Sequence, residues 1–280
     1  MLIFSCSKPK TRCQYNDVSR NGIDSVLIYE FTPKEGVIDT TKKNLIGLEI
    51  FDSIGRIIYS KYTTDSILSS IVIYSKSYYF PCSYDSLSYK FKYNGYRVTD
   101  IRLYNGKGDN VGNIECSNKG NMKIFTYKNI GGKIFGQTRQ LSGNGNLITR
   151  TLEYEYNLDY PNGTLLSIDI DTIIGNKEYW KTKRWLNYPN RKVLIDDDVI
   201  IFTIIKQKHK TINKYAKGER LEVTYDNMNR EIDRHYFNRE YSGETKYKYL
   251  GNTNLLLEKA EYNYLGDVTK IVRYVYKYRK

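Results

Sequence analysis

The segment that decides the fold of this chain is Leu87-Ser88-Tyr89-Lys90-Phe91-Lys92-Tyr93-Asn94-Gly95-Tyr96-Arg97-Val98. Before Asn94, apolar and aromatic residues alternate with Ser and Lys, and this period of two places successive side chains on opposite faces of a strand. Asn94-Gly95 then supplies the positive φ angles that a two-residue hairpin turn needs. The segment therefore predicts a β-hairpin.

The same pattern recurs along the chain. Leu152–Leu158 precedes Asn162-Gly163, and Tyr262 and Tyr264 precede the turn residues Leu265-Gly266-Asp267. We predict an all-β fold, an antiparallel meander of Tyr-rich β-hairpins forming a curled sheet or open half-barrel, with no helix longer than about three turns. Three further segments are assigned from composition: 105–121 and 142–146 as hairpin connections, and 199–211 as a buried strand that ends in a basic turn.

Tyrosine accounts for 29 of the 280 residues. A Tyr ring packs well on the pleat of a strand while its hydroxyl reaches water. The pattern therefore favours a half-buried Tyr ladder. The alternative is an aromatic platform for sugars or bases.

Two units carry a more specific motif, Phe51-Asp52-x-x-Gly55-Arg56 and Tyr225-Asp226-x-x-Asn229-Arg230. They resemble degenerate copies of the tyrosine-aspartate (YD) repeat of rearrangement-hotspot (Rhs) proteins, including lipoproteins of Bacteroidetes. The resemblance implies that each repeat adds one hairpin to a continuous, spiralling sheet. The copies here are unevenly spaced, so we expect a short curved sheet rather than a closed shell.

The N-terminus resembles a bacterial lipobox, because Ile3-Phe4-Ser5 precedes Cys6 and a polar stretch follows. This resemblance implies lipid attachment at Cys6 and anchoring in the cell envelope, at the outer membrane. A secretory signal has roughly 7–15 apolar residues before its cleavage site. We therefore expect the true start to lie upstream of Met1; the alternative is a chance match. Residues 1–20 are expected to form a tether and residues 21–280 a single hairpin-repeat domain.

The net charge of +13 invites a nucleic-acid interpretation. Most lysines alternate with apolar residues on strands, however, which argues against nucleic acid as a partner. Two basic clusters remain, at 206–210 and at 181–184. The candidate anion-binding residues belong to the second cluster and would bind an anionic glycan or glycolipid, the alternative being a solvated loop: Lys181, Lys183, Arg184, Trp180 and Trp185.

Catalytic, metal and cofactor sites have little support in the sequence. Of the two histidines, His209 lies in a lysine run, and His235 is expected to face away from its acidic neighbour Asp233. The carboxylates at 196–198 are interpreted as a solvated break before a strand rather than a Ca²⁺ site. Asp169 and Asp171 share a strand face, and acid–base chemistry there would need a partner from a second strand.

The cysteines add no zinc or redox motif. Cys82 and Cys116 are expected to be idle thiols, with a disulfide as the alternative. We therefore expect a non-enzymatic envelope lipoprotein that acts as a scaffold or binding surface, without a cofactor and with an unidentified protein partner. The alternatives are a cytoplasmic immunity or binding protein for a toxin, and a carbohydrate-active enzyme that uses carboxylates.

Overall fold

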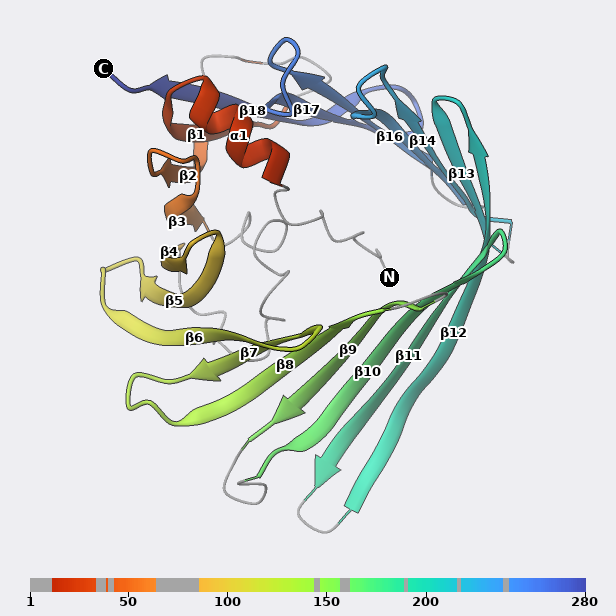
Figure 1. Cartoon of the computed structure of the whole chain (residues 1–280). Helices are drawn as coiled ribbons and strands as arrows, with labels where there is room; N and C mark the ends of the chain where they lie inside the picture. Colours follow the sequence, from red (N-terminus) through yellow and green to blue (C-terminus); the bar gives the residue numbers. More distant parts are fainter. Residues whose placement is uncertain are drawn as a thin grey trace. The chain divides into compact units, whose positions relative to one another are not determined.

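The computed structural model describes residues 12–33, 39, 43–63, 86–143, 147–156, 162–188, 191–215, 218–238 and 242–280. It is all-β apart from one short helix, and every strand pairing described is antiparallel (Figure 1). The antiparallel meander of hairpins is therefore confirmed. The chain divides into two compact units, Met1–Ser70 with Ile204–Lys280, and Ile71–Thr203.

In its described residues, the first unit contains the helix and nine strands. Its elements are α1 (Arg12–Arg20), β1 (Ile23–Phe31), β2 (Asn44–Phe51), β3 (Ile57–Thr63), β13 (Lys210–Tyr215), β14 (Arg220–Tyr225), β15 (Glu231–Phe237), β16 (Ser242–Tyr249), β17 (Leu256–Tyr262) and β18 (Val268–Tyr278). The strands pair in the order β13-β14-β15-β16-β17-β18-β1-β2-β3.

The second unit is a nine-stranded meander in which each strand pairs with the next along the chain (Figure 1). Its strands are β4 (Ser86–Asn94), β5 (Arg97–Asn105), β6 (Asn110–Lys119), β7 (Met122–Lys128), β8 (Ile134–Ser142), β9 (Leu147–Glu155), β10 (Thr164–Ile174), β11 (Lys177–Tyr188) and β12 (Arg191–Gln207). The boundary between the units falls within β12.

The first and last strands pair with each other, which the sequence did not predict. β1 pairs with β18 from Ile23↔Tyr278 to Phe31↔Ile271, and its other edge pairs with β2. An open half-barrel would leave the first and last strands of the meander as edges, with unpaired N–H and C=O groups. The open form was therefore wrong, because the terminal strands satisfy each other's backbone groups.

One turn geometry explains the repeated motif. At Asp52 the backbone N–H donates to the carbonyl of Arg56 (2.9 Å), the N–H of Gly55 donates to the carbonyl of Asp52 (3.0 Å), and Asp52 Oδ1 accepts from two further backbone N–H groups. The fourth residue takes a positive φ, 83° at Gly55. The same pair of backbone hydrogen bonds recurs in turns beginning at Asn105, Asn129, Tyr215, Asp226 and Asn263.

The turn beginning at Asp226 differs in having Asn229 at the positive-φ position, with φ of 58°. Asn tolerates the left-handed region better than most residues. The Arg230 guanidinium binds Asp226 (2.6 Å), lies over the Tyr249 ring at 4.7 Å, and donates to the carbonyls of Gly251 and Thr253. The aromatic-Asp-Arg motif therefore joins one turn of the sheet to the turn two strands away.

Most of the described tyrosines are half-buried, as the ladder interpretation predicts, but a few are fully buried. Tyr89 and Tyr127 lie on one face of the second unit among apolar residues and are 2% and 0% exposed. Burial raises the pKa of both hydroxyls, and Tyr127 finds a partner in Thr138 Oγ1 at 3.1 Å. These two rings belong to the core of the unit, whereas Tyr93, Tyr154 and Tyr156 are half-buried.

Four local assignments are corrected. Residues 110–119, expected to be part of a connection, form strand β6, and residues 196–198 lie inside β12 rather than in a break before it. Val199 and Ile201 of β12 are 53% and 40% exposed, so this segment is not a buried strand. The basic cluster at 181–184 lies in β11 and not in a loop.

Helix α1 lies within the segment expected to be a tether. Val18 is buried beside β1, and Asp17 Oδ2 accepts hydrogen bonds from the backbone and side chain of Asn254 at 2.8 and 2.9 Å. Residues 12–20 are thus part of the folded unit. Cys6 and Cys82 lie outside the described residues, as do residues 144–146; Cys116 is a free thiol, and burial together with the nearby Asp100 raises its pKa to about 12.

Candidate functional site

Strand β11 distributes the five predicted anion-binding residues over both faces of the sheet. Pairing with β10 is regular up to Arg184, and the register shift with β12 between Arg184 and Trp185 places its extra residue on β12, so side chains alternate along β11. Lys181, Lys183 and Trp185 share one face, whereas Trp180 and Arg184 share the other. The structure therefore does not bring the five residues together as one surface.

The Lys181 face is the more basic of the two. Lys183 forms an ion pair with Asp197 at 2.8 Å, and the Lys192 ammonium lies 4.5 Å from the centre of the Trp185 ring. Burial lowers the pKa of Lys192. This face thus includes Lys192, a cation that was not predicted. Of its predicted cations, Lys183 is held in the ion pair with Asp197.

The opposite face carries carboxylates. Asp171 and Glu178 are hydrogen-bonded to each other, and burial followed by the Glu178 charge raises the pKa of Asp171 to about 7. The Trp180 indole N–H donates to Glu178 Oε1 at 2.6 Å. Burial and the neighbouring carboxylate therefore favour the protonated form of Asp171 up to near neutral pH.

This pair is the second-strand partner that acid–base chemistry at Asp171 would need. Its geometry differs from that of a glycosidase, in which the two carboxyl groups lie about 5–5.5 Å or about 6.5–9.5 Å apart. A hydrogen bond between carboxyl oxygens spans only about 2.5–3.0 Å. Asp169 accepts a hydrogen bond from Thr182 Oγ1 at 2.8 Å. Asp169 and Asp171 thus both have partners on β11.

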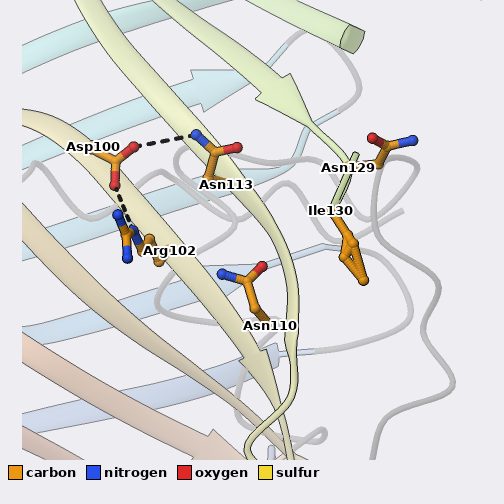
Figure 2. A pocket seen from close by; sticks show the side chains of 6 residues that line it. All are labelled: Asp100, Arg102, Asn110, Asn113, Asn129 and Ile130. Atoms are coloured by element: carbon orange, nitrogen blue, oxygen red, sulfur yellow. Dashed lines mark hydrogen bonds and ion pairs between the residues drawn. The ribbon is translucent and has the colours of Figure 1, made fainter. Parts of the chain in front are cut away.

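A polar hollow of about 360 Å³ lies in the second unit, where β5, β6 and the β7–β8 turn come together (Figure 2). Asp100 is its central charge. Asn113 Nδ2 donates to Asp100 Oδ2 at 3.2 Å, and Arg102 Nε lies 3.7 Å from Asp100 Oδ1. Figure 2 shows these three residues together, with Asn110 on the same pair of strands and Asn129 and Ile130 across the hollow.

The hollow presents both hydrogen-bond donors and an acceptor. Asn110 Oδ1 accepts from the N–H of Gly112 (2.9 Å) and Asn129 Oδ1 from the N–H of Lys133 (3.0 Å), so their amide groups are oriented with Nδ2 left to donate. Asp100 Oδ1 is buried without a hydrogen-bond partner. Buried polar atoms normally have partners, so this oxygen is an acceptor with unused capacity.

The first unit carries ion pairs on both faces of its sheet. One face has a charged ladder across β13 to β18, formed by Lys210–Glu222, Arg220–Glu222, Lys246–Glu244, Lys248–Glu258 and Arg273–Glu258. The other face has Arg234–Glu231, Lys259–Glu261 and Lys270–Glu30. Neither face is therefore an uninterrupted apolar band.

Sequence reasoning missed the hollow because its residues come from two strands and a turn that lies later in the chain. Asp100 and Arg102 are ordinary strand residues, and Asn110 and Asn129 have the composition of turns. The signal that was available is the recurrence of Asn at strand ends in neighbouring hairpins, which stacks amide groups along one edge of a meander.

No family model matches the chain, and no curated protein matches it. Among solved structures, it is similar to a porin-like protein from Bacteroides uniformis (8% identity, TM-score 0.41, covering 92% of this chain and 97% of that one) and to a porin-like protein from Bacteroides vulgatus (8%, 0.33, 90% and 97%). It is also similar to a chain of the Photorhabdus luminescens Tc holotoxin pore (10%, 0.27), covering 85% of this chain and 12% of that one. Likenesses at these identities and scores establish neither family nor function.

Among the described residues, no helix has the length and apolar character needed to cross a membrane.

Proposed function

We propose that this protein is a non-enzymatic binding protein of the cell envelope, built from YD-like hairpin repeats and held at the membrane by lipid on Cys6. The observation that carries the binding role is the polar hollow at Asp100. Its volume lies within the range of ligand sites, about 300–1,000 Å³.

The chemistry of the hollow fits a neutral glycan. A sugar hydroxyl donates one hydrogen bond and accepts others. Here Asp100 Oδ1 would accept, while Asn110 Nδ2, Asn129 Nδ2 and the Arg102 guanidinium would donate. Asp100 and Arg102 balance each other's charge, which disfavours a strongly charged ligand. The side chain of Ile130, 71% exposed, offers an apolar surface to the C–H groups of a sugar ring.

The ion pairs on both faces of the first unit support a tethered protein over one that spans the membrane with its strands. A strand of a transmembrane barrel presents an apolar face to lipid, and Lys or Arg at the bilayer midplane costs about 2–4 kcal/mol. The charged ladder and the pairs on the opposite face would both violate this requirement if either face met lipid. The ion pairs therefore argue against lipid contact on either face.

Binding to a glycan array tests the proposal. We expect the purified protein to bind neutral glycans and to leave them uncleaved. Changing Asn110 and Asn129 to Asp keeps the Oδ1 atoms that orient the loops but removes two N–H donors. Since one hydrogen bond contributes about 0.5–1.5 kcal/mol, the double change should weaken binding about tenfold or more.

The matched control is Asn118→Asp, on β6 but outside the hollow, which adds a carboxylate of the same kind. It should leave affinity unchanged. The absence of glycan binding, or equal binding by the hollow variant and the wild type, would refute the role of the hollow; release of shortened glycans would favour the enzyme alternative.

A further inference from the structure

Three metal-ligating side chains converge on the charged ladder of the first unit. Asp233 and His235 lie on β15 and Glu244 lies opposite His235 on β16. His235 Nε2 is 2.7 Å from Glu244 Oε1 and 3.3 Å from Asp233 Oδ2, and one ligand atom from each residue lies within 4.8 Å of the others. Asp233 and His235 thus share a face, which corrects the expectation that they point apart, because residues two apart on a strand face the same side.

This cluster is held in position by its neighbours. The His235 ring stacks on Phe237, with centroids 5.6 Å apart. Glu222, opposite His235 on β14, is engaged by Lys210 and Arg220, and the hydrogen bond from Lys210 leads the interactions that lower its pKa. Glu222 is therefore neutralised by its own cations, and the three converging groups remain as a set.

Asp233 contains an oxygen that the protein leaves unsatisfied. Its Oδ2 faces His235, and its Oδ1 is buried without a hydrogen-bond partner. A buried oxygen of this kind is costly unless a partner is supplied. A bound cation is one such partner.

We propose that Asp233, His235 and Glu244 form a site for a divalent transition metal of the zinc class. One imidazole and two carboxylates are a donor set suited to such ions, with water completing the coordination. In a tetrahedral zinc site the ligand atoms lie about 3.3 Å apart, given metal–ligand bonds of about 2.0–2.2 Å. The separation of His235 Nε2 from Asp233 Oδ2, 3.3 Å, matches this value, and that from Glu244 Oε1, 2.7 Å, would lengthen when an ion is bound. The ion would link β15 to β16 across the sheet.

Lys246 sets the affinity of this site. Its Nζ lies 3.0 Å from Glu244 Oε2, so it uses the carboxylate oxygen that faces away from His235. It orients Glu244 and also repels an incoming cation.

Titration of the metal-free full chain with Zn²⁺, in competition with a chromophoric chelator, tests the site. We expect His235→Gln to weaken Zn²⁺ binding at least about 10- to 100-fold, which is the usual effect of losing a residue that only supports a metal ligand. Lys246→Ala should strengthen Zn²⁺ binding. The matched control is His209→Gln, which removes the other histidine of the chain and should bind as the wild type does. Asp233→Asn, which keeps the side-chain shape, provides a second variant.

Co²⁺ provides an independent readout, because a site of nitrogen and oxygen ligands lacks the sulfur-to-cobalt absorption that cysteine ligands produce. A sulfur band, an undiminished affinity in His235→Gln or Asp233→Asn with an unchanged circular dichroism spectrum, or no Zn²⁺ binding by the wild type would each overturn the proposal.

Discussion

Single residues determine how tightly the hairpins turn. In the turn that begins at Asn129, Gly132 occupies the positive-φ position (77°), whereas the preceding Gly131 does not. A Cβ at Gly132 would meet no atom within 4 Å, and one at Gly131 would make an ordinary contact of 3.5 Å with Asn129 Oδ1. The backbone angle alone therefore separates these two adjacent glycines.

We predict that Gly132→Ala destabilises the protein by about 1–2 kcal/mol, which is the cost of the left-handed conformation for a residue with a Cβ. Gly131→Ala should be neutral or slightly stabilising, because Ala restricts the unfolded chain. Thermal unfolding followed by circular dichroism measures both. Equal effects of the two substitutions would show that the turn does not have this geometry.

A second residue-level prediction concerns Asp171, whose pKa in the folded protein is about 7. The unfolded carboxyl ionises near its ordinary value of 3.8, so between these values the folded state holds a proton that the unfolded state has lost. The contribution of Asp171 to stability is therefore complete below about pH 4 and is lost as the pH rises through 7.

Asp171→Asn should remove this pH dependence of stability. The melting temperature should then fall less between pH 5 and pH 8 than it does in the wild type, by a few degrees, because each kcal/mol of stability corresponds to about 2–4 °C. The control is Asp169→Asn on the same strand and face. If the two variants show the same pH profile as the wild type, the pKa of Asp171 is not raised in the folded protein.

At the scale of an element, β11 converts a basic run in the sequence into two different surfaces. We predict that Lys181→Gln with Lys183→Gln weakens binding to vesicles of anionic lipid, by up to about 1 kcal/mol for each lysine. Arg184→Gln should have little effect, because its side chain lies on the acidic face. Co-sedimentation with vesicles measures both variants, and equal losses would mean that the basic charge acts only as a diffuse field.

Local elements were predictable from the sequence, whereas their long-range partners were not. The period of two and Asn94-Gly95 gave the β4–β5 hairpin correctly, because a hairpin depends on residues that are neighbours in the chain. The β1–β18 pairing joins residues at opposite ends of the sequence, and period-two patterns do not specify which distant edge a strand will meet. The hollow and the Asp233–His235–Glu244 cluster escaped prediction because each depends on the register between strands.

For the whole molecule, we propose a sheet that does not contact lipid and a lipid on Cys6 that holds the protein at the envelope. The ion pairs on both faces of the first unit motivate the first part. The lipobox-like residues before Cys6 motivate the second.

The most direct test is the fractionation of cells that express the gene from its native start, as wild type and as Cys6→Ser, with fatty-acid labelling of both proteins. The account predicts that the wild type is labelled and sediments with membranes, and that Cys6→Ser is unlabelled and moves to the soluble fraction. A Cys6→Ser protein that stays in the membrane after carbonate extraction, or a wild type that carries no label, would contradict it.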